Sequence, residues 1–388
     1  MFKRDFPKLN ASPSILGFGL MRLPVKSPLG KIGKLRSVMG GIDTKKAQEM
    51  VDYAIENGVN YFDTSWIYHM GKSEVFIGKA LARYPRDSYY LANKMPTWLI
   101  HSRQGAEKIF EKQLKRCGVD YFDFYLCHAV SKHNFKKYEK YALDFLIEKK
   151  KEGKIKRLGF SFHDHPESID AIADYYPWDF ALIQFNYFDY HSAIGSKHLY
   201  EALTKRNIPV QVMEPVRGGA LAKMPKDAES VFKDFAPEKS IASWAIKFCM
   251  NFDNVSVVLS GMSNFEQIKD NIETAKNFEK MTENELKTLW KAEALYRGKA
   301  LSPCTECHYC SCPKGINIAR NFSLYNEYFV HWVPLSEFGW LKDEQEKLGG
   351  GAAKHCVQCG ACESKCPQKI KIGKWMKKIT ENKEYGNK

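Results

Sequence analysis

The chain has 388 residues, of which 44% are hydrophobic and 27% charged. This balance is typical of globular proteins and excludes a collagen-like, disordered or low-complexity chain. Lysine and arginine (59) outnumber aspartate and glutamate (45), giving a formal net charge of +14, but acidic residues interleave with basic ones throughout. No nucleic-acid-binding motif, membrane-spanning run or secretory signal accompanies this charge. We therefore expect a soluble cytoplasmic protein with neither nucleic acid nor a membrane as partner.

Eight short apolar runs, each followed by a segment with helical periodicity, organise the first 280 residues. The runs are 15–19, 61–65, 89–95, 122–129, 155–162, 180–186, 209–213 and 255–260. This alternation predicts an α/β fold, a (β/α)8 TIM barrel. Periodicity does not by itself exclude an open doubly wound sheet. However, no GxGxxG follows the first run, which argues against a Rossmann domain.

Polar residues gather just after several of these runs, where a barrel carries its active site. Asp63 and Tyr68 follow the second run, Lys94 ends the third and His128 ends the fourth. A nearby ammonium lowers the pKa of a tyrosine toward the range useful for proton donation, and an aspartate keeps that ammonium charged. Such a set suits protonation of a carbonyl while a nicotinamide delivers hydride. A helix cap, a surface lysine and a core histidine are the structural alternatives.

Residues 10–280 resemble the aldo-keto reductase family. Segment 58–74, GVNYFDTSWIYHMGKSE, is similar to the Asp-plus-Tyr signature of that family, and the later lysine and histidine fall at matching places. The resemblance implies Tyr68 as general acid/base, NADP(H) or NAD(H) as cofactor, and a small carbonyl or alcohol as substrate. It implies a catalytic tetrad of Asp63, Tyr68, Lys94 and His128. Candidates for the substrate pocket are Trp66, His69, Trp98 and Tyr187.

The same resemblance assigns cofactor-binding positions. Ser161 and Gln184 match the positions that hold the nicotinamide carboxamide. The pyrophosphate is expected near the loops after the seventh and eighth runs, since barrels bind phosphate there. The candidates in the first of these loops are Arg217, Gly218 and Gly219. On the adenosine side they are Ser263, Gln267 and Asn271.

Four positions depart from the family pattern. Phe162 replaces a frequent asparagine, and Met213 replaces the aromatic residue that often stacks on the nicotinamide. Gly261 and Gln267 stand where basic residues usually clasp the adenosine 2′-phosphate. A bidentate cation is therefore missing, and the choice between NADPH and NADH stays open.

Eleven cysteines are distributed very unevenly. Cys117, Cys127 and Cys249 lie in core-like runs and are expected to be inert packing residues. The other eight form two runs near the C-terminus, and clustered cysteines in a cytosolic protein indicate metal binding. The second run is Cys356, Cys359, Cys362 and Cys366, followed by Pro367, which is the bacterial ferredoxin spacing. The first run is Cys304, Cys307, Cys310 and Cys312, with one residue instead of three before its last cysteine.

The tail thus resembles a ferredoxin-type module with two [4Fe–4S] clusters. The resemblance implies one cluster on Cys304, Cys307, Cys310 and Cys366. It implies the other on Cys356, Cys359, Cys362 and Cys312. Structural zinc is the alternative, although two tight triplets followed by Cys-Pro fit cubane clusters better. The predicted organisation is a barrel over 1–280, a linking helix over 281–300 and a small, mainly helical iron–sulfur domain over 301–388.

Two functions remain in competition. The leading hypothesis is a nicotinamide-dependent oxidoreductase that reduces a carbonyl or oxidises an alcohol and is coupled to the clusters for electron transfer. The rival is a non-catalytic nucleotide-binding electron-transfer or redox-sensor protein on the same scaffold. A separate third idea is that the basic surface docks an acidic electron carrier, a ferredoxin or flavodoxin. A nicotinamide moves two electrons together and a cluster moves one, so the tail could carry electrons, sense redox state or brace the barrel.

Overall fold

The computed structural model describes residues 1–26, 41–164, 166–191, 195–300, 302, 304, 310–331, 344–366 and 370–381. These residues form two compact units. The barrel unit contains Met1–Lys223 and Ala236–Leu286, and the tail unit contains Met224–Phe235 and Lys287–Lys388. No helix in the described ranges combines the length and apolar character needed to cross a membrane.

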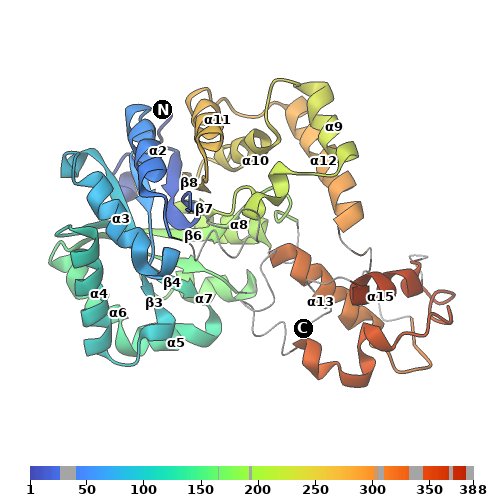
Figure 1. The fold of residues 1–388 in the computed structure, drawn as a ribbon. Helices are drawn as coiled ribbons and strands as arrows, with labels where there is room; N and C mark the ends of the chain where they lie inside the picture. The colour runs from blue at the N-terminus through green and yellow to red at the C-terminus, as the bar shows by residue number, and fades with distance from the viewer. Residues whose placement is uncertain are drawn as a thin grey trace. The chain divides into compact units, whose positions relative to one another are not determined.

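Eight parallel strands close into a barrel in chain order (Figure 1). They are β1 (Leu16–Gly19), β2 (Tyr61–Asp63), β3 (Tyr90–Pro96), β4 (Phe122–Val130), β5 (Ile155–Phe162), β6 (Phe180–Gln184), β7 (Val210–Met213) and β8 (Val255–Gly261). Each strand lies within one of the predicted apolar runs or differs from it by one or two residues at an end. The barrel prediction is confirmed, and closure of β1 onto β8 excludes the open sheet.

Helices surround the strands of the barrel unit in the order expected for a (β/α)8 fold. They are α2 (Thr44–Glu56), α3 (Lys72–Leu81), α4 (Arg103–Cys117), α5 (Lys132–Tyr141), α6 (Leu143–Lys151), α7 (Ile169–Ala173), α8 (Ser196–Lys205), α10 (Ile241–Met250) and α11 (Phe265–Lys276). Several begin at a side-chain cap. Ser102 accepts from the Gly105 N–H at the start of α4, and Asn264 accepts from the Gln267 N–H at the start of α11.

Bulky side chains fill the barrel interior, so the interior is a packed core and the chemistry is confined to one end. The rings of Tyr61, Phe124 and Phe180 meet edge to face across it, with centroids 5.0 and 5.1 Å apart. Gly17 on β1 fits only because it lacks a side chain: a Cβ there would lie 2.6 Å from Leu259.

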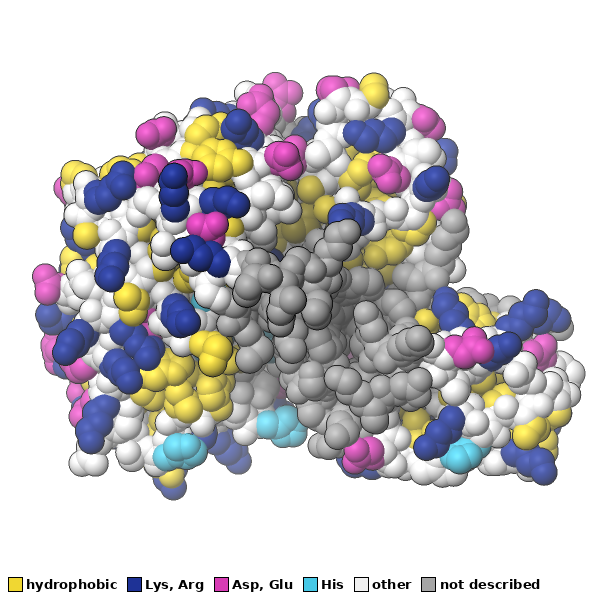
Figure 2. Space-filling model, in the orientation of Figure 1, with side chains coloured by type: hydrophobic (Ala, Val, Ile, Leu, Met, Phe, Trp, Pro, Cys, Tyr) yellow, Lys and Arg dark blue, Asp and Glu magenta, His cyan; other side chains and the backbone are white. Residues whose placement is uncertain are grey.

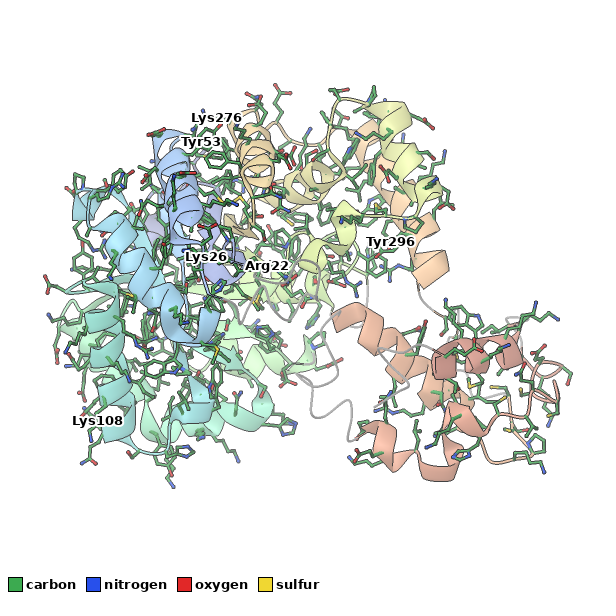
Figure 3. All side chains as sticks on the ribbon, viewed as in Figure 1. Arg22, Lys26, Tyr53, Lys108, Lys276 and Tyr296 are labelled. Atoms are coloured by element: carbon green, nitrogen blue, oxygen red, sulfur yellow. The ribbon has the colours of Figure 1, made fainter. Side chains whose placement is uncertain are left out.

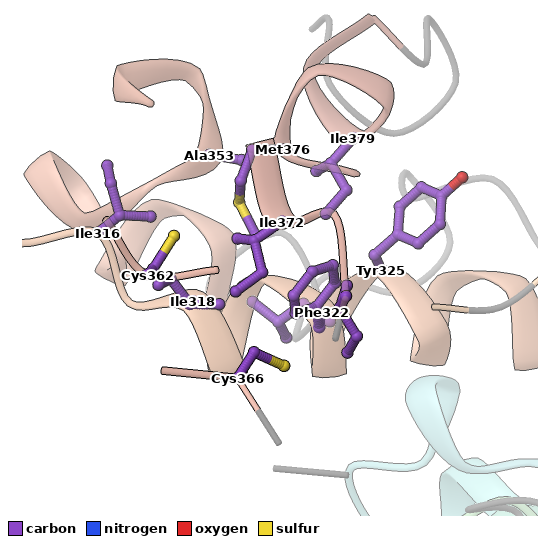
Figure 4. Packing of buried hydrophobic residues seen from close by; sticks show 12 residues of the cluster. Ile316, Ile318, Phe322, Tyr325, Ala353, Cys362, Cys366, Ile372, Met376 and Ile379 are labelled. Atoms are coloured by element: carbon purple, nitrogen blue, oxygen red, sulfur yellow. The ribbon is translucent and has the colours of Figure 1, made fainter. Parts of the chain in front are cut away.

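The tail unit is mainly helical in its described part. Its helices are α9 (Lys226–Phe235), α12 (Glu283–Ala300, whose first four residues are assigned to the barrel unit), α13 (Ile318–His331) and α15 (Ile372–Glu381). Buried apolar residues of α13 and α15 share one core with Ala353, Cys362 and Cys366 (Figure 4). The tail unit therefore has a hydrophobic core of its own, although that core is small.

Candidate active site at the barrel mouth

The ends of β2 and β3 bring three of the predicted residues into direct contact. Asp63 ends β2, Lys94 lies in β3, and Tyr68 starts the short 3-10 helix η3 (Tyr68–Gly71). Lys94 Nζ lies 2.6 and 2.7 Å from the two Asp63 carboxylate oxygens and 2.9 Å from the Thr64 carbonyl oxygen. The same Nζ lies 3.4 Å from Tyr68 Oη. An ammonium thus bridges a carboxylate and a phenol at the mouth of the barrel.

The ion pair between Asp63 and Lys94 is almost completely buried, with Lys94 1% and Asp63 3% exposed. Burial is the largest single influence and lowers the pKa of Lys94, but the Asp63 carboxylate and Tyr68 together raise it by more, so the pKa lies above its ordinary value. Burial raises the pKa of Asp63 against the opposing effect of Lys94. Lys94 therefore stays charged at neutral pH and holds a fixed positive charge beside Tyr68.

The pKa of Tyr68 is shifted in the opposite direction to the one the sequence suggested. Burial raises it above its ordinary value, and the neighbouring Lys94 lowers it by less than burial raises it. The expected effect of the ammonium is present, but loss of solvent around the phenol outweighs it. Tyr68 is therefore protonated throughout the neutral range.

His128 lies in β4, the strand that pairs with β3. Its Nδ1 lies 3.2 Å from Ser65 Oγ, and its ring packs on Trp98 with centroids 5.2 Å apart. Just after it, β4 is irregular: Ala129 has φ = 53°, and its N–H donates to Ser161 Oγ over 2.8 Å. Such irregularities often re-aim a side chain beside an active site. The histidine and the predicted Ser161 are thus fixed together.

Burial lowers the pKa of His128 well below its ordinary value, with Lys94 and His163 adding to the effect. In the unfolded chain a histidine titrates near pH 6.5. As the pH falls from 7 to 5, the unfolded state binds a proton that the folded state does not. The unfolding free energy therefore falls, by up to about 1.4 kcal/mol per pH unit from this residue.

His128→Gln should remove this part of the acid sensitivity. Urea unfolding at pH 7, 6 and 5 measures it, and the variant should lose less stability than the parent across the series. His133→Gln on the exposed surface of α5 is the matched control. Equal losses in the parent and in His128→Gln would contradict the assignment.

A buried network of hydrogen bonds holds the β3 backbone at Lys94. Gln113 Nε2 on α4 lies 2.9 Å from Glu74 Oε1 and 3.0 Å from the Lys94 carbonyl oxygen. Asn93 donates to the same Glu74 oxygen over 3.0 Å, and Arg116 binds the other oxygen over 2.8 Å. The network fixes the backbone of β3 at the lysine.

Close packing of α3 against α4 makes this network possible. A Cβ at Gly78 would lie 2.4 Å from the Cys117 carbonyl oxygen, so only glycine allows the approach. Gln113 was not among the residues predicted from the sequence, although a signal was available. Gln113 is a polar residue on the buried stripe of α4, which otherwise consists of Ala106, Ile109, Phe110, Leu114 and Cys117.

Ser161 and Gln184 have hydrogen-bonding capacity suited to an amide ligand. Because Ser161 Oγ accepts from Ala129, its own hydrogen can be donated elsewhere. Gln184 Nε2 donates to Asp189 Oδ2 over 2.8 Å, which orients the side chain and presents its amide oxygen as an acceptor. A nicotinamide carboxamide offers one acceptor and two donors, so these two residues fit it.

The structure puts Arg217 to a different use from the one expected of a phosphate ligand. Its side chain is buried, with Nε 3.1 Å from Asp189 Oδ1 and the guanidinium 4.5 Å from the Phe188 ring centroid. Gly218 and Gly219 follow it with φ of 62° and 93°, which glycine adopts readily. A phosphate contact by Arg217, Gly218 or Gly219 stays a prediction, and the contact of Arg217 with Asp189 anchors this loop.

The adenosine-side candidates form a connected turn at the start of α11. Gln267 Oε1 accepts from the Ser263 N–H over 2.7 Å, and Asn271 Nδ2 donates to Ser260 Oγ over 2.8 Å. Arg22 lies at this corner of the barrel mouth (Figure 3): its carbonyl oxygen accepts from Ser263 Oγ, and its stem would lie 3.1 Å from a Cβ at Gly261. Arg22 is thus a cation near the position where the sequence lacks one.

Among the proposed pocket residues, Trp98 is 41% exposed and contacts His128. Trp66 instead faces α4, with the Arg116 guanidinium 4.3 Å from its ring centroid. His69 and Tyr187 are fully buried. Only Trp98 of these four combines exposure with contact to the tetrad.

Six of the eight tail cysteines pack around one apolar core. Cys362 and Cys366 belong to that core, close to Ile318 and Phe322 in Figure 4. Packed against it are Cys304, Cys310, Cys312 and Cys356. Cys359 is exposed, and Cys307 lies outside the described residues. Within the described ranges, no three His, Cys, Asp or Glu side chains converge closely enough to hold a metal ion.

Comparison with known proteins establishes the family. Residues 16–294, well over half of the chain, match the profile described as the Aldo/keto reductase family. The chain belongs to the aldo/keto reductase family. The prediction of an NAD(P)-dependent oxidoreductase of this type is confirmed by that match. The matched region ends before the first tail cysteine, so the family does not account for the iron–sulfur prediction.

Individual relatives of this aldo/keto reductase are distant. An uncharacterized oxidoreductase, YqkF, of Bacillus subtilis is 26% identical over 64% of this chain and 88% of that protein. The L-galactose dehydrogenase of Arabidopsis thaliana is 25% identical over 73% and 90%. Among solved structures, the aldo-keto reductase AKR11C1 of Bacillus halodurans has a TM-score of 0.59 at 24% identity and covers 75% of this chain and 96% of its own. The structural likeness supports the barrel fold.

Proposed function

We propose that the barrel catalyses NAD(P)H-dependent reduction of a carbonyl compound, with Tyr68 as the proton donor. The observation that carries this proposal is the convergence of Asp63, Lys94 and Tyr68 within hydrogen-bonding distance at the mouth of the barrel. Relatives point to small dicarbonyls as substrates: an NADH-specific methylglyoxal reductase of Escherichia coli is 27% identical over 216 residues, and a glyoxal reductase of Bacillus subtilis is 30% identical over 182 residues.

The proposed reaction is balanced by one hydride and one proton. Bound NAD(P)H would supply the hydride to the carbonyl carbon. Tyr68 Oη donates its proton to the carbonyl oxygen, giving the alcohol, and Lys94 at 3.4 Å stabilises the phenolate that remains. Ser65 can donate to Nδ1 of the neutral His128, which places the histidine proton on Nε2 to orient the carbonyl oxygen.

For the cofactor we propose contacts with residues from five strand ends. Ser161 and Gln184 hold the carboxamide, the backbone at Gly218 and Gly219 meets the pyrophosphate, and Ser263, Gln267 and Asn271 border the adenosine. Arg22 supplies the cation at this corner, where it also lies 3.8 Å from Glu214. The Arg22 side chain is partly exposed and is paired with Glu214. A cation that is already paired would bind a 2′-phosphate weakly, so we propose that the site accepts either NADPH or NADH.

Turnover assays test this function directly. Anaerobic protein should oxidise NADPH or NADH only when a carbonyl such as methylglyoxal is added, and the corresponding alcohol should accumulate. Binding of either nucleotide without oxidation by any carbonyl in a broad panel would contradict the proposal. That outcome would favour the nucleotide-binding electron-transfer or sensor protein.

We further propose that the tail holds two [4Fe–4S] clusters on its eight cysteines. The spacing of the second run supports this, as does the gathering of six cysteines around one small core. Burial, together with the neighbouring thiols of Cys312, Cys356 and Cys310, raises the pKa of Cys362 to about 11. These thiols would lose their protons on binding iron, so the metal would hold them as thiolates.

The proposed ligand sets are those implied by the ferredoxin resemblance. Cys362 interacts with Cys312 and Cys356 of its own proposed set, which Cys359 completes, and also with Cys310 of the other set, so the division of ligands rests on the resemblance. The other set is Cys304, Cys307, Cys310 and Cys366. A cytoplasmic location accompanies this proposal, because free thiols persist in a reducing compartment.

Metal analysis of anaerobically purified protein tests the clusters. We expect about eight iron and eight sulfide per chain, with absorption and EPR signals typical of [4Fe–4S] centres. Zinc without sulfide would contradict the assignment and would indicate a structural zinc site instead.

An anaerobic titration tests the coupling of the clusters to the barrel. One NADH or NADPH carries two electrons, which would reduce two clusters by one electron each. We expect either nucleotide to reduce the clusters, as monitored by visible absorption and EPR. Reduction of the clusters by dithionite but by neither nucleotide would show that the clusters do not exchange electrons with the nucleotide site of the barrel.

A further inference from the structure

Exposed lysines are concentrated around the second cysteine run. The described segments 310–318, 351–366 and 370–381 contain seven lysines but only two acidic residues, Glu363 and Glu381. All seven are exposed, and dark-blue side chains lie over this part of the tail unit in Figure 2. We call them the lysine surface: Lys314, Lys354, Lys365, Lys371, Lys374, Lys377 and Lys378.

Packing holds this surface against the cysteine loops. The Gly373 N–H at the start of α15 donates to Glu363 Oε1 over 2.9 Å, and Lys371 Nζ lies 3.8 Å from Glu363 Oε2. The first turn of α15 therefore lies on the loop of the second cysteine run. Lys365 reaches the first run as well, donating to Ser311 Oγ over 2.8 Å. Lysines of this surface therefore contact the loops of both cysteine runs.

An uncharged tip lies within the lysine surface. Val357 is 62% exposed, and Cys359 two residues later is exposed. Gln358 between them has φ = 54°. A small apolar centre with a charged rim is the composition of a protein interface. It is also the place where a proposed cluster ligand reaches the surface.

We infer that the lysine surface docks a small acidic one-electron carrier protein, with the Val357–Cys359 tip against its redox centre. The inference rests on the proposed clusters. Single exposed ion pairs contribute little binding energy, but a surface of one sign steers an oppositely charged partner and raises the association rate by 10- to 1,000-fold. Transient redox complexes use small interfaces of this kind.

Other polyanions fit this surface less well. A bilayer would need a broader apolar face than one exposed valine. Single-stranded nucleic acid would need exposed aromatic rings for stacking, whereas Trp375, the tryptophan of α15, is covered by Lys378 at 4.1 Å. The transfer would balance: a cluster held by these cysteines would supply one electron, and the carrier would accept it without a proton.

Electron transfer to a probe carrier tests the inference on full-length, cluster-loaded protein. The probe is an acidic ferredoxin with a [2Fe–2S] centre, whose spectrum differs from that of a [4Fe–4S] cluster. Pre-reduced protein and oxidised probe are mixed in a stopped-flow instrument at rising salt. The test variant is Lys354→Glu/Lys371→Glu/Lys374→Glu, and the matched control is Lys132→Glu/Lys136→Glu/Lys140→Glu on α5. A Lys→Arg version of the test variant keeps the charge.

We expect the second-order rate constant to fall with salt and to drop about tenfold or more in the test variant. The control and the Lys→Arg version should retain the parent rate. Cluster-loaded proteins whose rates depend on neither salt nor charge reversal would overturn the docking surface. So would binding to anionic vesicles or DNA without electron transfer to the probe. Absence of iron and sulfide would instead overturn the proposed clusters, and the docking with them.

Discussion

Replacing Tyr68 with phenylalanine should lower kcat/KM for carbonyl reduction by about 10²- to 10⁴-fold, the usual contribution of a positioned general acid. The ring itself is retained, so the packing at the mouth of the barrel should persist. The Lys94 ammonium remains in place, but it lies bound to Asp63 and cannot replace the phenol. Stopped-flow and steady-state assays with NADPH and NADH measure the loss.

The affinity for either nucleotide should change less than about twofold in this variant, since Tyr68 lies with the proposed catalytic residues and outside the proposed cofactor contacts. Tyr53→Phe on α2 (Figure 3) is the matched control and should keep full activity. Undiminished turnover in Tyr68→Phe would show that the proton comes from another group.

Replacing Lys94 with methionine should abolish turnover and also destabilise the fold by about 3–5 kcal/mol. The reason is that Asp63, 3% exposed, would keep a buried charge without its partner. Urea unfolding measures the loss of stability, with Lys79→Met on the exposed face of α3 as the control.

The double variant Asp63→Asn/Lys94→Met separates the two effects. It should regain much of the stability, because neither charge remains, and regain none of the activity. Additive losses of stability in the single and double variants would contradict a coupled ion pair.

The barrel could be predicted from sequence because its signal is local and repeated. Each buried parallel strand is a short apolar run, and the eight runs recur with helical segments between them. The placement of the proposed tetrad could be predicted for a related reason. Asp63, Lys94 and His128 lie at or near the C-terminal ends of their strands, so the topology itself brings them to one end of the barrel.

The supporting residues could not be predicted in the same way. Contacts of Gln113 with Glu74 and the Lys94 backbone depend on how closely α3 and α4 approach, which no local pattern encodes. The burial of Arg217 against Asp189 depends similarly on the conformation of its loop. The sign of the Tyr68 pKa shift was missed because the sequence shows the ammonium but not the loss of solvent.

The tail shows the converse case. Its cysteine spacing is a strong local signal for iron–sulfur binding, but in the described residues no three His, Cys, Asp or Glu side chains converge on a metal position, so the clusters stay a proposal. The lysine surface could not be predicted from the sequence, because its members lie in three separate segments of the chain. In the whole sequence their charge is only part of a diffuse excess.

Transfer of a labelled hydride tests the central claim most directly. NADPH or NADH carrying deuterium at the reactive carbon is incubated anaerobically with the protein and a carbonyl substrate, and the product is examined by NMR and mass spectrometry. We expect one deuterium on the carbinol carbon of the alcohol, formed by the parent and greatly diminished in Tyr68→Phe. An alcohol without the label, or no alcohol while nucleotide binds, would contradict a carbonyl reductase built on this barrel.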